Sequence, residues 1–205
     1  SAETNTYCSH ASAWLCCSSV LPLRGEQQAT DNYPANGTFY SLIHSLDEEK
    51  TIMGKYFGTD GFRGEAGITL TADHAYKVGR FLGWYYNALR ERNGNNEPAS
   101  IVIGKDTRRS SYMFEYSLVA GLTASGADAY LLHVTTTPSV AYIARVDDFD
   151  CGITIAASHN PYYDNGIKLI DCYGEKMPEE ILLLVEDYID GKLHVFDKDW
   201  PELPF

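Results

Sequence analysis

The chain has 205 residues, of which 44% are hydrophobic and 13% aromatic, enough apolar material for a packed domain core. Its formal net charge is −12 and its basic residues form no patch, which argues against nucleic acid and anionic membranes as partners. No apolar run in the sequence is long enough for a membrane-spanning helix.

Residues 1–52 differ in composition from the rest of the chain. They contain three of the five cysteines, scattered turn residues and little periodicity. A secretory segment is disfavoured because no basic stretch precedes the apolar residues, and a metal site because the cysteines lack the usual ligand spacing. We expect a foreign leader, disordered or artefactual, then a domain over residues 53–195 and the start of a linker over residues 196–205.

A glycine-rich segment, Lys55–Gly64, opens the expected domain. Glycines at every third position allow a backbone turn whose N–H groups converge on an anion, and Arg63 adds a planar, permanently charged donor. The spacing differs from the dinucleotide-binding fingerprint. Taken alone, the segment also fits a glycine-rich chain start with one surface arginine. Its candidate phosphate-binding residues are Gly58, Thr59, Asp60 and Gly61.

Helix and strand patterns alternate after this segment. Thr71 is expected to cap a helix that ends near Arg92, and Ser110 or Ser111 to cap a second helix over residues 112–124. Further helices are expected over residues 138–145 and 179–189, the last with Pro178 at its first position. The expected strands cover residues 101–104, 129–134, 151–156 and 167–170. This alternation predicts a three-layer α/β/α domain with a mixed sheet.

The segment from Ala156 to Lys168 contains the strongest candidate for a reactive group. Ser158 follows a short apolar strand, whose carboxyl end is where open α/β sheets present their chemistry. Asn160-Pro161 and Asp164-Asn165-Gly166 predict two turns, after which a strand returns with Lys168 at its start. The sequence therefore predicts a hydroxyl group and a cation that lie close together.

Two other interpretations use the same residues. A polar turn followed by a solvated surface lysine would look similar in isolation. A hydrolase pair of Ser158 and His159 is disfavoured, because adjacent side chains in extended backbone point to opposite faces and cannot share a proton. The sequence also contains no G-x-S-x-G nucleophile elbow.

The whole thirteen-residue segment closely resembles the active-site serine loop of the α-D-phosphohexomutases, enzymes that move a phosphate between two positions of a hexose. The form Gly-Thr-Asp-Gly-x-Arg-Gly of the glycine-rich segment is most similar to the phosphoglucosamine mutase branch. The resemblance implies a cytoplasmic isomerase that interconverts glucosamine 6-phosphate and glucosamine 1-phosphate through a phosphoserine and a bisphosphate intermediate.

The resemblance also implies roles for individual residues. Ser158 would be phosphorylated in the resting enzyme, and its phosphate would help to hold one Mg²⁺ ion. Lys168 and Arg63 would stabilise charge or assist proton transfer. His159 would shape the loop or contact phosphate, and Asn160 would bind substrate or phosphate.

The family shares a further element with residues 104–108, Gly-Lys-Asp-Thr-Arg. Arg108 would either reach the active site and bind phosphate or brace the site from outside. Bracing is the favoured role, because Asp106 is close enough in the chain to pair with Arg108 locally.

The implied partners are a phosphorylated hexosamine or hexose, with a hexose 1,6-bisphosphate as activator. The alternatives are a phosphomannomutase or phosphoglucomutase of the same superfamily, or a non-catalytic phosphosugar-binding module. The family's active site is assembled from four domains, and the resemblance covers only the first, from about Met53 to Gly191. The Asp-x-Asp-x-Asp-Arg metal loop of the second domain is not in this sequence. We therefore expect the remaining Mg²⁺ ligands in an absent second domain and no activity from this chain alone.

Overall fold

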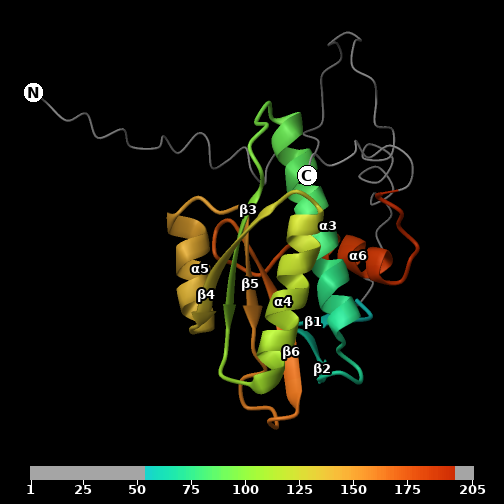
Figure 1. Cartoon of the computed structure of the whole chain (residues 1–205), viewed down its shortest axis with the longest axis vertical. Helices are drawn as coiled ribbons and strands as arrows, with labels where there is room; N and C mark the ends of the chain where they lie inside the picture. Colours follow the sequence, from blue (N-terminus) through green and yellow to red (C-terminus); the bar gives the residue numbers. More distant parts are fainter. Residues whose placement is uncertain (1–53, 197–205) are drawn as a thin grey trace, which may run out of the picture. The chain divides into compact units, whose positions relative to one another are not determined.

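The structure, a computed structural model, describes residues 54–196, which form a sheet with helices on both faces (Figure 1). The predicted leader over residues 1–52 and all but the first residue of the predicted linker lie outside the described residues. The strands are β1 (Phe57–Gly58), β2 (Gly61–Glu65), β3 (Ser100–Lys105), β4 (Asp128–Val134), β5 (Cys151–Ile155) and β6 (Asp164–Asp171). The helices are α3 (Ala72–Arg92), α4 (Arg109–Ala124), α5 (Thr137–Val146) and α6 (Glu179–Ile189).

The sheet is mixed, with the strand order β1-β2-β6-β5-β3-β4. β3 pairs in parallel with β4 and β5, whereas the pairs β5–β6, β2–β6 and β1–β2 are antiparallel. The carboxyl ends of the three parallel strands therefore lie at the same end of the sheet, and β6 starts at that end. The connections that leave β3 and β5 at this end carry Arg108, Ser158, His159 and Asn160.

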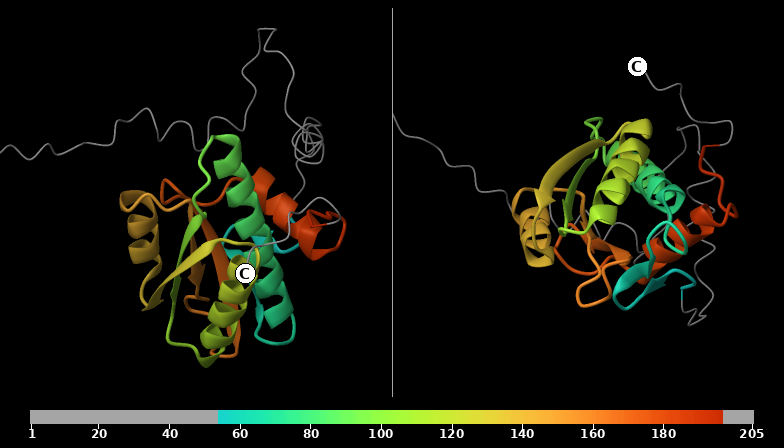
Figure 2. Two further views of the ribbon diagram at one scale, coloured as in Figure 1. Left: turned by 45° about the horizontal axis from the view of Figure 1, so that its top comes forward. Right: turned by 60° about the horizontal axis from the view of Figure 1, so that its bottom comes forward.

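The helices cover the two faces of the sheet in separate layers, as Figures 1 and 2 show. α5 lies on one face, where Val140 and Ala144 form a fully buried cluster with Val102 of β3 and Ile170 of β6. α4 and α3 lie on the other face, and α6 packs against α3. The expected three-layer α/β/α architecture with a mixed sheet is confirmed.

The core follows from the apolar periodicity of the elements that surround it. β3 buries Ile101, Val102 and Ile103 completely, as a central strand with helices on both faces must. α3 begins after Thr71, whose hydroxyl accepts a hydrogen bond from the backbone N–H of His74, so the predicted cap is confirmed. None of the described helices is long and apolar enough to cross a membrane.

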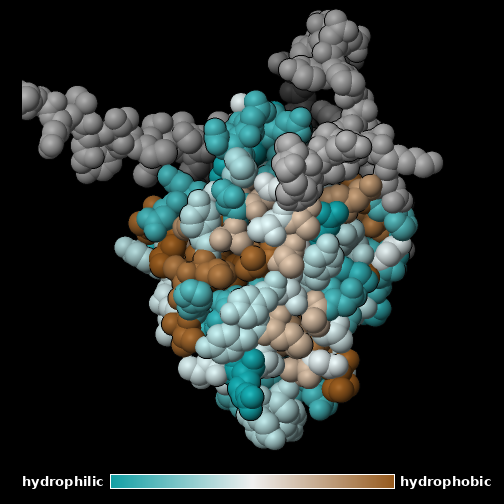
Figure 3. Space-filling view, viewed as in Figure 1, coloured by the Kyte–Doolittle hydropathy of each residue, from teal (hydrophilic) through white to brown (hydrophobic). Residues whose placement is uncertain are grey.

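β4 is one edge of the sheet, and it exposes two large apolar side chains. Figure 3 shows hydrophobic residues gathered over β4 and beside α5. About half of the side-chain surface is exposed at Tyr130 and Val134 of β4 and at Val146 of α5.

Three local predictions were wrong. α4 begins at Arg109, with Arg108 as an N-cap whose side chain makes no capping bond, rather than behind Ser110 or Ser111. Pro178 is the N-cap of α6, one position before its predicted place in the first turn. Asn165 and Gly166 lie within β6 and form no turn.

The reason for the last difference is tertiary. The buried Asn165 amide donates to the hydroxyl oxygens of both Ser110 and Ser111, at 2.9 Å each. Its own side-chain oxygen accepts from the N–H of Gly166. These contacts outweigh the turn preference of the Asn-Gly pair, and the turn forms earlier, where the N–H of Asp164 donates to the carbonyl of Pro161.

Candidate active site

The loop between β5 and β6 presents Ser158 at the carboxyl end of the parallel strands. Ala157 is fully buried, whereas Ser158 is exposed. Ser158 has a φ of 51°, in the left-handed region that residues other than glycine seldom adopt. The N–H of Asn160 donates to the carbonyl of Ala157 at 2.9 Å and closes the bend. A strained non-glycine residue in an exposed loop is characteristic of functional sites.

Arg108 holds this loop from the β3–α4 turn. Its guanidinium group donates to the carbonyl oxygens of Ser158, Asn160 and Pro161. The predicted local pair with Asp106 is also present, with Nε of Arg108 2.9 Å from Oδ2 of Asp106. The loop backbone is therefore tied to an element fifty residues earlier in the chain.

Arg63 of β2 reaches the same loop from the other side. Its Nη1 donates to the side-chain oxygen of Asn160 at 3.0 Å, and Nδ2 of Asn160 donates to Asp164 at 3.0 Å. Nη2 of Arg63 lies 3.3 Å from the carboxylate of Asp60. Nε of Arg63 is buried and has no hydrogen-bond partner within residues 54–196. The structure thus brings the glycine-rich segment and the serine loop together through one arginine.

The predicted separation of the Ser158 and His159 side chains was wrong. Nδ1 of His159 lies 3.4 Å from Oγ of Ser158, because Ser158 is in the left-handed conformation and not in extended backbone. The distance exceeds that of an ordinary hydroxyl hydrogen bond, about 2.7–3.0 Å. His159 therefore lies beside the hydroxyl group without a well-formed hydrogen bond to it.

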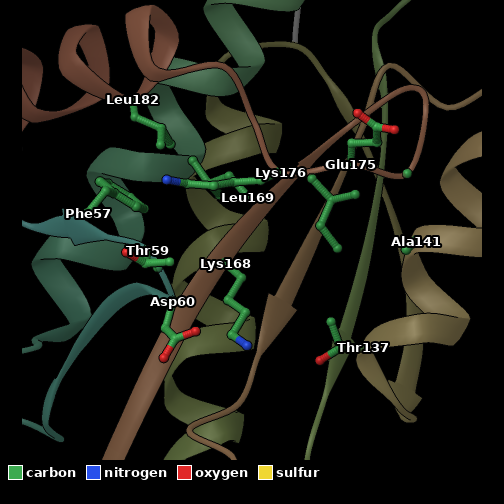
Figure 4. A pocket seen from close by; sticks show the side chains of 13 residues that line it. Phe57, Thr59, Asp60, Thr137, Ala141, Lys168, Leu169, Glu175, Lys176 and Leu182 are labelled. Atoms are coloured by element: carbon green, nitrogen blue, oxygen red, sulfur yellow. The ribbon is translucent and has the colours of Figure 1, made fainter.

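Lys168 lies in the interior of β6, opposite Thr154 of β5, and not at the start of the strand. Its side chain enters a pocket of about 200 Å³ between the β1–β2 hairpin, β6, the start of α5 and the loop after β6. In Figure 4 the side chain of Lys168 extends between the carboxylate of Asp60 and the hydroxyl of Thr137. Both a cation and hydroxyl groups therefore face the pocket.

The glycine-rich segment forms a tight hairpin beside this pocket. Gly58 pairs with Gly61, so Thr59 and Asp60 form the tip. Gly61 has a φ of +89°, and a Cβ there would lie only 2.5 Å from the carbonyl oxygen of Ile167. Only glycine permits both this turn and the close approach of the hairpin to β6.

The predicted site residues therefore fall into two groups. Thr59, Asp60, Gly61 and Lys168 line the pocket, whereas Ser158 does not. The second group lies at the serine loop. It consists of His159 and Asn160 in the loop and of Arg63 and Arg108, which contact it. The ion pair between Asp60 and Arg63 connects the two groups. Gly58 lies at the base of the hairpin tip and does not line the pocket.

Glu186 of α6 positions the hairpin, a role that was not predicted from the sequence. Its buried carboxylate accepts hydrogen bonds at 2.7 Å from the backbone N–H groups of Lys55, Tyr56 and Phe57. The available signal was a carboxylate on the apolar face of α6, next to the buried Val185. A buried carboxylate requires partners, which here are consecutive backbone donors.

Asp190, one turn further along α6, holds the same chain segment. Its Oδ1 accepts from Nζ of Lys55 and from the hydroxyl of Tyr56, both at 2.7 Å. The hydrogen bond between Lys55 and Asp190 raises the pKa of the lysine and lowers the pKa of the carboxyl group. Thr137, which lines the pocket from α5, was also missed, and it carried no sequence signal.

The described residues do not complete a metal site. Within residues 54–196 there is no group of three or more His, Cys, Asp or Glu side chains that could hold a metal ion. A serine phosphate at Ser158 would supply only some of the oxygen ligands that Mg²⁺ needs.

Comparison with known families agrees with this geometry. A family model described as phosphoglucomutase/phosphomannomutase, alpha/beta/alpha domain I, matches residues 54–194. The chain belongs to this family. The match covers the sheet, all four described helices and both groups of candidate site residues.

Individual relatives in the family are similar over the same region. The phosphoglucosamine mutase of Lachnospira eligens is 74% identical over 141 residues, which are 69% of this chain and 30% of that protein. The phosphoglucosamine mutase of Lachnoclostridium phytofermentans is 66% identical over 75% of this chain and 31% of that protein. The chain thus spans about a third of the length of these curated relatives.

A solved structure shares the fold. A phosphoglucomutase/phosphomannomutase family protein from Burkholderia thailandensis has a TM-score of 0.55 and 27% sequence identity, over 67% of this chain and 30% of that one. The alternating elements of the described residues therefore form the alpha/beta/alpha domain I of this family.

Proposed function

We propose that this chain supplies the phosphoserine domain of a phosphoglucosamine mutase, which interconverts glucosamine 6-phosphate and glucosamine 1-phosphate. The observation that supports it best is the exposed Ser158, held in left-handed backbone at the carboxyl end of β5. The names of the similar proteins from Lachnospira eligens and Lachnoclostridium phytofermentans favour glucosamine as the sugar.

The proposed reaction is a phosphoryl shuttle. The bond between phosphorus and Oγ of phospho-Ser158 breaks, and a bond forms between phosphorus and a sugar hydroxyl oxygen, whose proton passes to a base. The product is a hexosamine 1,6-bisphosphate. After it reorients, Oγ of Ser158 takes the other phosphoryl group and the sugar oxygen regains a proton. A hexose 1,6-bisphosphate would activate the enzyme by phosphorylating Ser158.

Each predicted residue has a place in this scheme. Lys168 would neutralise phosphate charge from the pocket, assisted by the hydroxyl of Thr59 and the N–H of Gly61. Arg63 would stabilise the transferring group through the positive charge of its guanidinium, which lies beside the serine loop. His159 lies next to the hydroxyl of Ser158 and would contact the phosphate or exchange its proton.

Other hairpin and loop residues would shape the phosphate site. Asp60 pairs with Arg63 and shares the pocket with Lys168, so it would orient both cations. Gly58 closes the hairpin and Asn160 joins Arg63 to the serine loop. The Ser158 phosphate would also hold Mg²⁺ in part, and the ion would neutralise phosphoryl charge. The reaction would take place in the cytoplasm.

A chimeric enzyme tests the proposal. Residues 54–194 would replace the matching region of the Lachnospira eligens phosphoglucosamine mutase, which is 74% identical. We expect conversion of glucosamine phosphates and transfer of label from a hexose 1,6-bisphosphate to Ser158. Ser158→Ala should abolish both, whereas Ser117→Ala on the exposed side of α4 should change neither. Label on another residue, or none on a folded chimera, would refute the phosphoserine mechanism.

A second candidate function is a non-catalytic phosphosugar-binding module. The pocket around Lys168 favours it, since a cation and hydroxyl groups could hold a phosphosugar without any transfer. Saturable binding of glucosamine 6-phosphate to a chimera that is never labelled at Ser158 would favour this module. The same chimera supplied with mannose and glucose phosphates tests the phosphomannomutase and phosphoglucomutase alternatives.

A further inference from the structure

The guanidinium group of Arg108 directs its donors to protein atoms. Nη1 donates to the carbonyl of Pro161 at 2.6 Å, and Nη2 donates to the carbonyls of Ser158 and Asn160 at 3.0 Å each. Nε donates to Asp106 at 2.9 Å. All three nitrogens of the guanidinium are therefore engaged within the fold, and three of the four bonds hold the serine loop.

The orientation of Arg108 is itself set by a carboxylate. Oδ1 of Asp106 accepts from the backbone N–H of Arg108 at 3.0 Å and from the hydroxyl of Ser111 at 2.6 Å. Because both oxygens of Asp106 are occupied, the guanidinium plane has little freedom to turn toward a ligand. We name Asp106, Arg108 and Ser111 the arginine clamp.

The clamp acts on the strained part of the loop. A left-handed φ is unfavourable for a residue with a side chain and persists only where surrounding contacts hold it. The carbonyl of Ser158 is one of the atoms that Arg108 binds, so the clamp holds the peptide unit that directly follows the strained residue. Fixing three carbonyls of one loop requires the planar fork of arginine, which a lysine ammonium cannot replace.

From these contacts we propose that Arg108 is a positioning residue that holds Ser158 in its left-handed conformation, and not a phosphate ligand. The inference deepens the proposed function, on which its catalytic meaning rests. In this proposal the guanidinium group of Arg108 binds the loop backbone, and Arg63 and Lys168 are the cations that neutralise phosphate.

Amide hydrogen exchange on the chain without sugar or phosphate tests the clamp. The reporters are the N–H groups of Asn160 and Asp164, which close the two bends of the loop. In Arg108→Ala both should exchange about tenfold faster or more, because charge-assisted hydrogen bonds to the loop are lost. The matched control, Arg109→Ala, changes an exposed neighbouring arginine and should leave both rates unchanged.

Two further arms extend the test, and the first of them remains decisive if Arg108→Ala fails to fold. Arg108→Lys retains the positive charge, and we expect faster loop exchange while the interior amides of α3 stay protected. Millimolar guanidinium ion should slow the loop exchange of a folded Arg108→Ala variant but not that of Arg108→Lys. Loop exchange in Arg108→Lys at the rate of the unchanged chain would overturn the clamp.

Exchange measured with and without inorganic phosphate distinguishes the two possible roles of Arg108, a clamp on the loop or a phosphate ligand. If Arg108 bound phosphate, Arg108→Lys would exchange normally without ligand and lose only the protection that phosphate adds; this pattern overturns the proposal. If only the proposed function fails, the results differ. Loop exchange would still be faster in Arg108→Lys, but Ser158 would never be labelled in the chimera.

Discussion

The carboxylate of Glu186 lies 2.7 Å from the backbone nitrogen of Phe57, across 129 positions of the chain. The same carboxylate binds the N–H groups of Lys55 and Tyr56. One side chain of α6 therefore fixes the start of β1, and with it the hairpin whose tip borders the pocket of Lys168. This carboxylate therefore contributes both to the stability of the domain and to the geometry of the candidate site.

We predict that Glu186→Ala lowers the free energy of unfolding by about 3 kcal/mol, because one buried and two partly buried backbone donors lose their acceptor. Urea unfolding followed by circular dichroism measures the loss. Glu180→Ala, at an exposed position of the same helix, is the control and should cost less than about 0.5 kcal/mol. Equal stability of the two variants would show that the carboxylate does not anchor the hairpin.

Stability should fall in mild acid through His74. Nδ1 of His74 accepts the backbone N–H of Thr71, and the ring packs against Tyr56 and Phe62 of the hairpin. Burial lowers the pKa of His74, partly offset by the charge of Asp73. The unfolded state thus binds the proton more readily than the folded state. The contribution of His74 is complete above about pH 6.5 and is lost progressively as the pH falls below it.

The measurement is the free energy of unfolding at about pH 7.5 and about pH 5.5 for the unchanged chain and for His74→Gln. Glutamine keeps a side-chain acceptor for the N–H of Thr71 but cannot be protonated. The unchanged chain should lose more stability on acidification than the variant. Identical losses in the two proteins would mean that His74 does not control this pH dependence.

The contact between α3 and α4 should not tolerate a methyl group at Gly121. A Cβ at this position would lie 2.2 Å from the carbonyl oxygen of Tyr76, so the helix axes would have to move apart. We expect Gly121→Ala to destabilise the domain by about 2–3 kcal/mol, measured by thermal unfolding. Gly58→Ala makes the same change where no atom lies within 4 Å and should leave the melting temperature nearly unchanged. Similar effects at both positions would contradict the close packing.

The buried ion pair of Lys105 and Glu115 should behave as a unit. Both side chains are almost completely buried, and Nζ of Lys105 also lies 3.8 Å from the centre of the Tyr112 ring. Lys105→Met or Glu115→Leu alone leaves an unpaired buried charge and should cost about 3–5 kcal/mol. The double variant should recover most of that loss. A double-mutant cycle in urea measures the coupling, and additive losses would argue against a direct pair.

Much of the fold was readable from the sequence because its signals are local. The apolar periodicity and the cap at Thr71 predict α3 to its first residue, and α6 matches its predicted range. The alternation of helices and strands was sufficient for the three-layer architecture. The glycine-rich segment and the serine loop identify the family through residues that are continuous in sequence, so no folding was needed to find them.

The conformation of the site was decided by tertiary contacts. Asn165 and Gly166 have strong turn preferences, yet the buried amide bonds to α4 place them in a strand. Asp106 orients Arg108 locally, but the contact of Arg108 with the carbonyl of Ser158 and the anchoring by Glu186 join residues at least fifty positions apart in the chain. Local sequence therefore determined most of the helices and strands and singled out Ser158 as the candidate reactive serine. Only the packed structure could decide which polar groups hold that serine in place, because each of those bonds requires two distant segments to be brought together first.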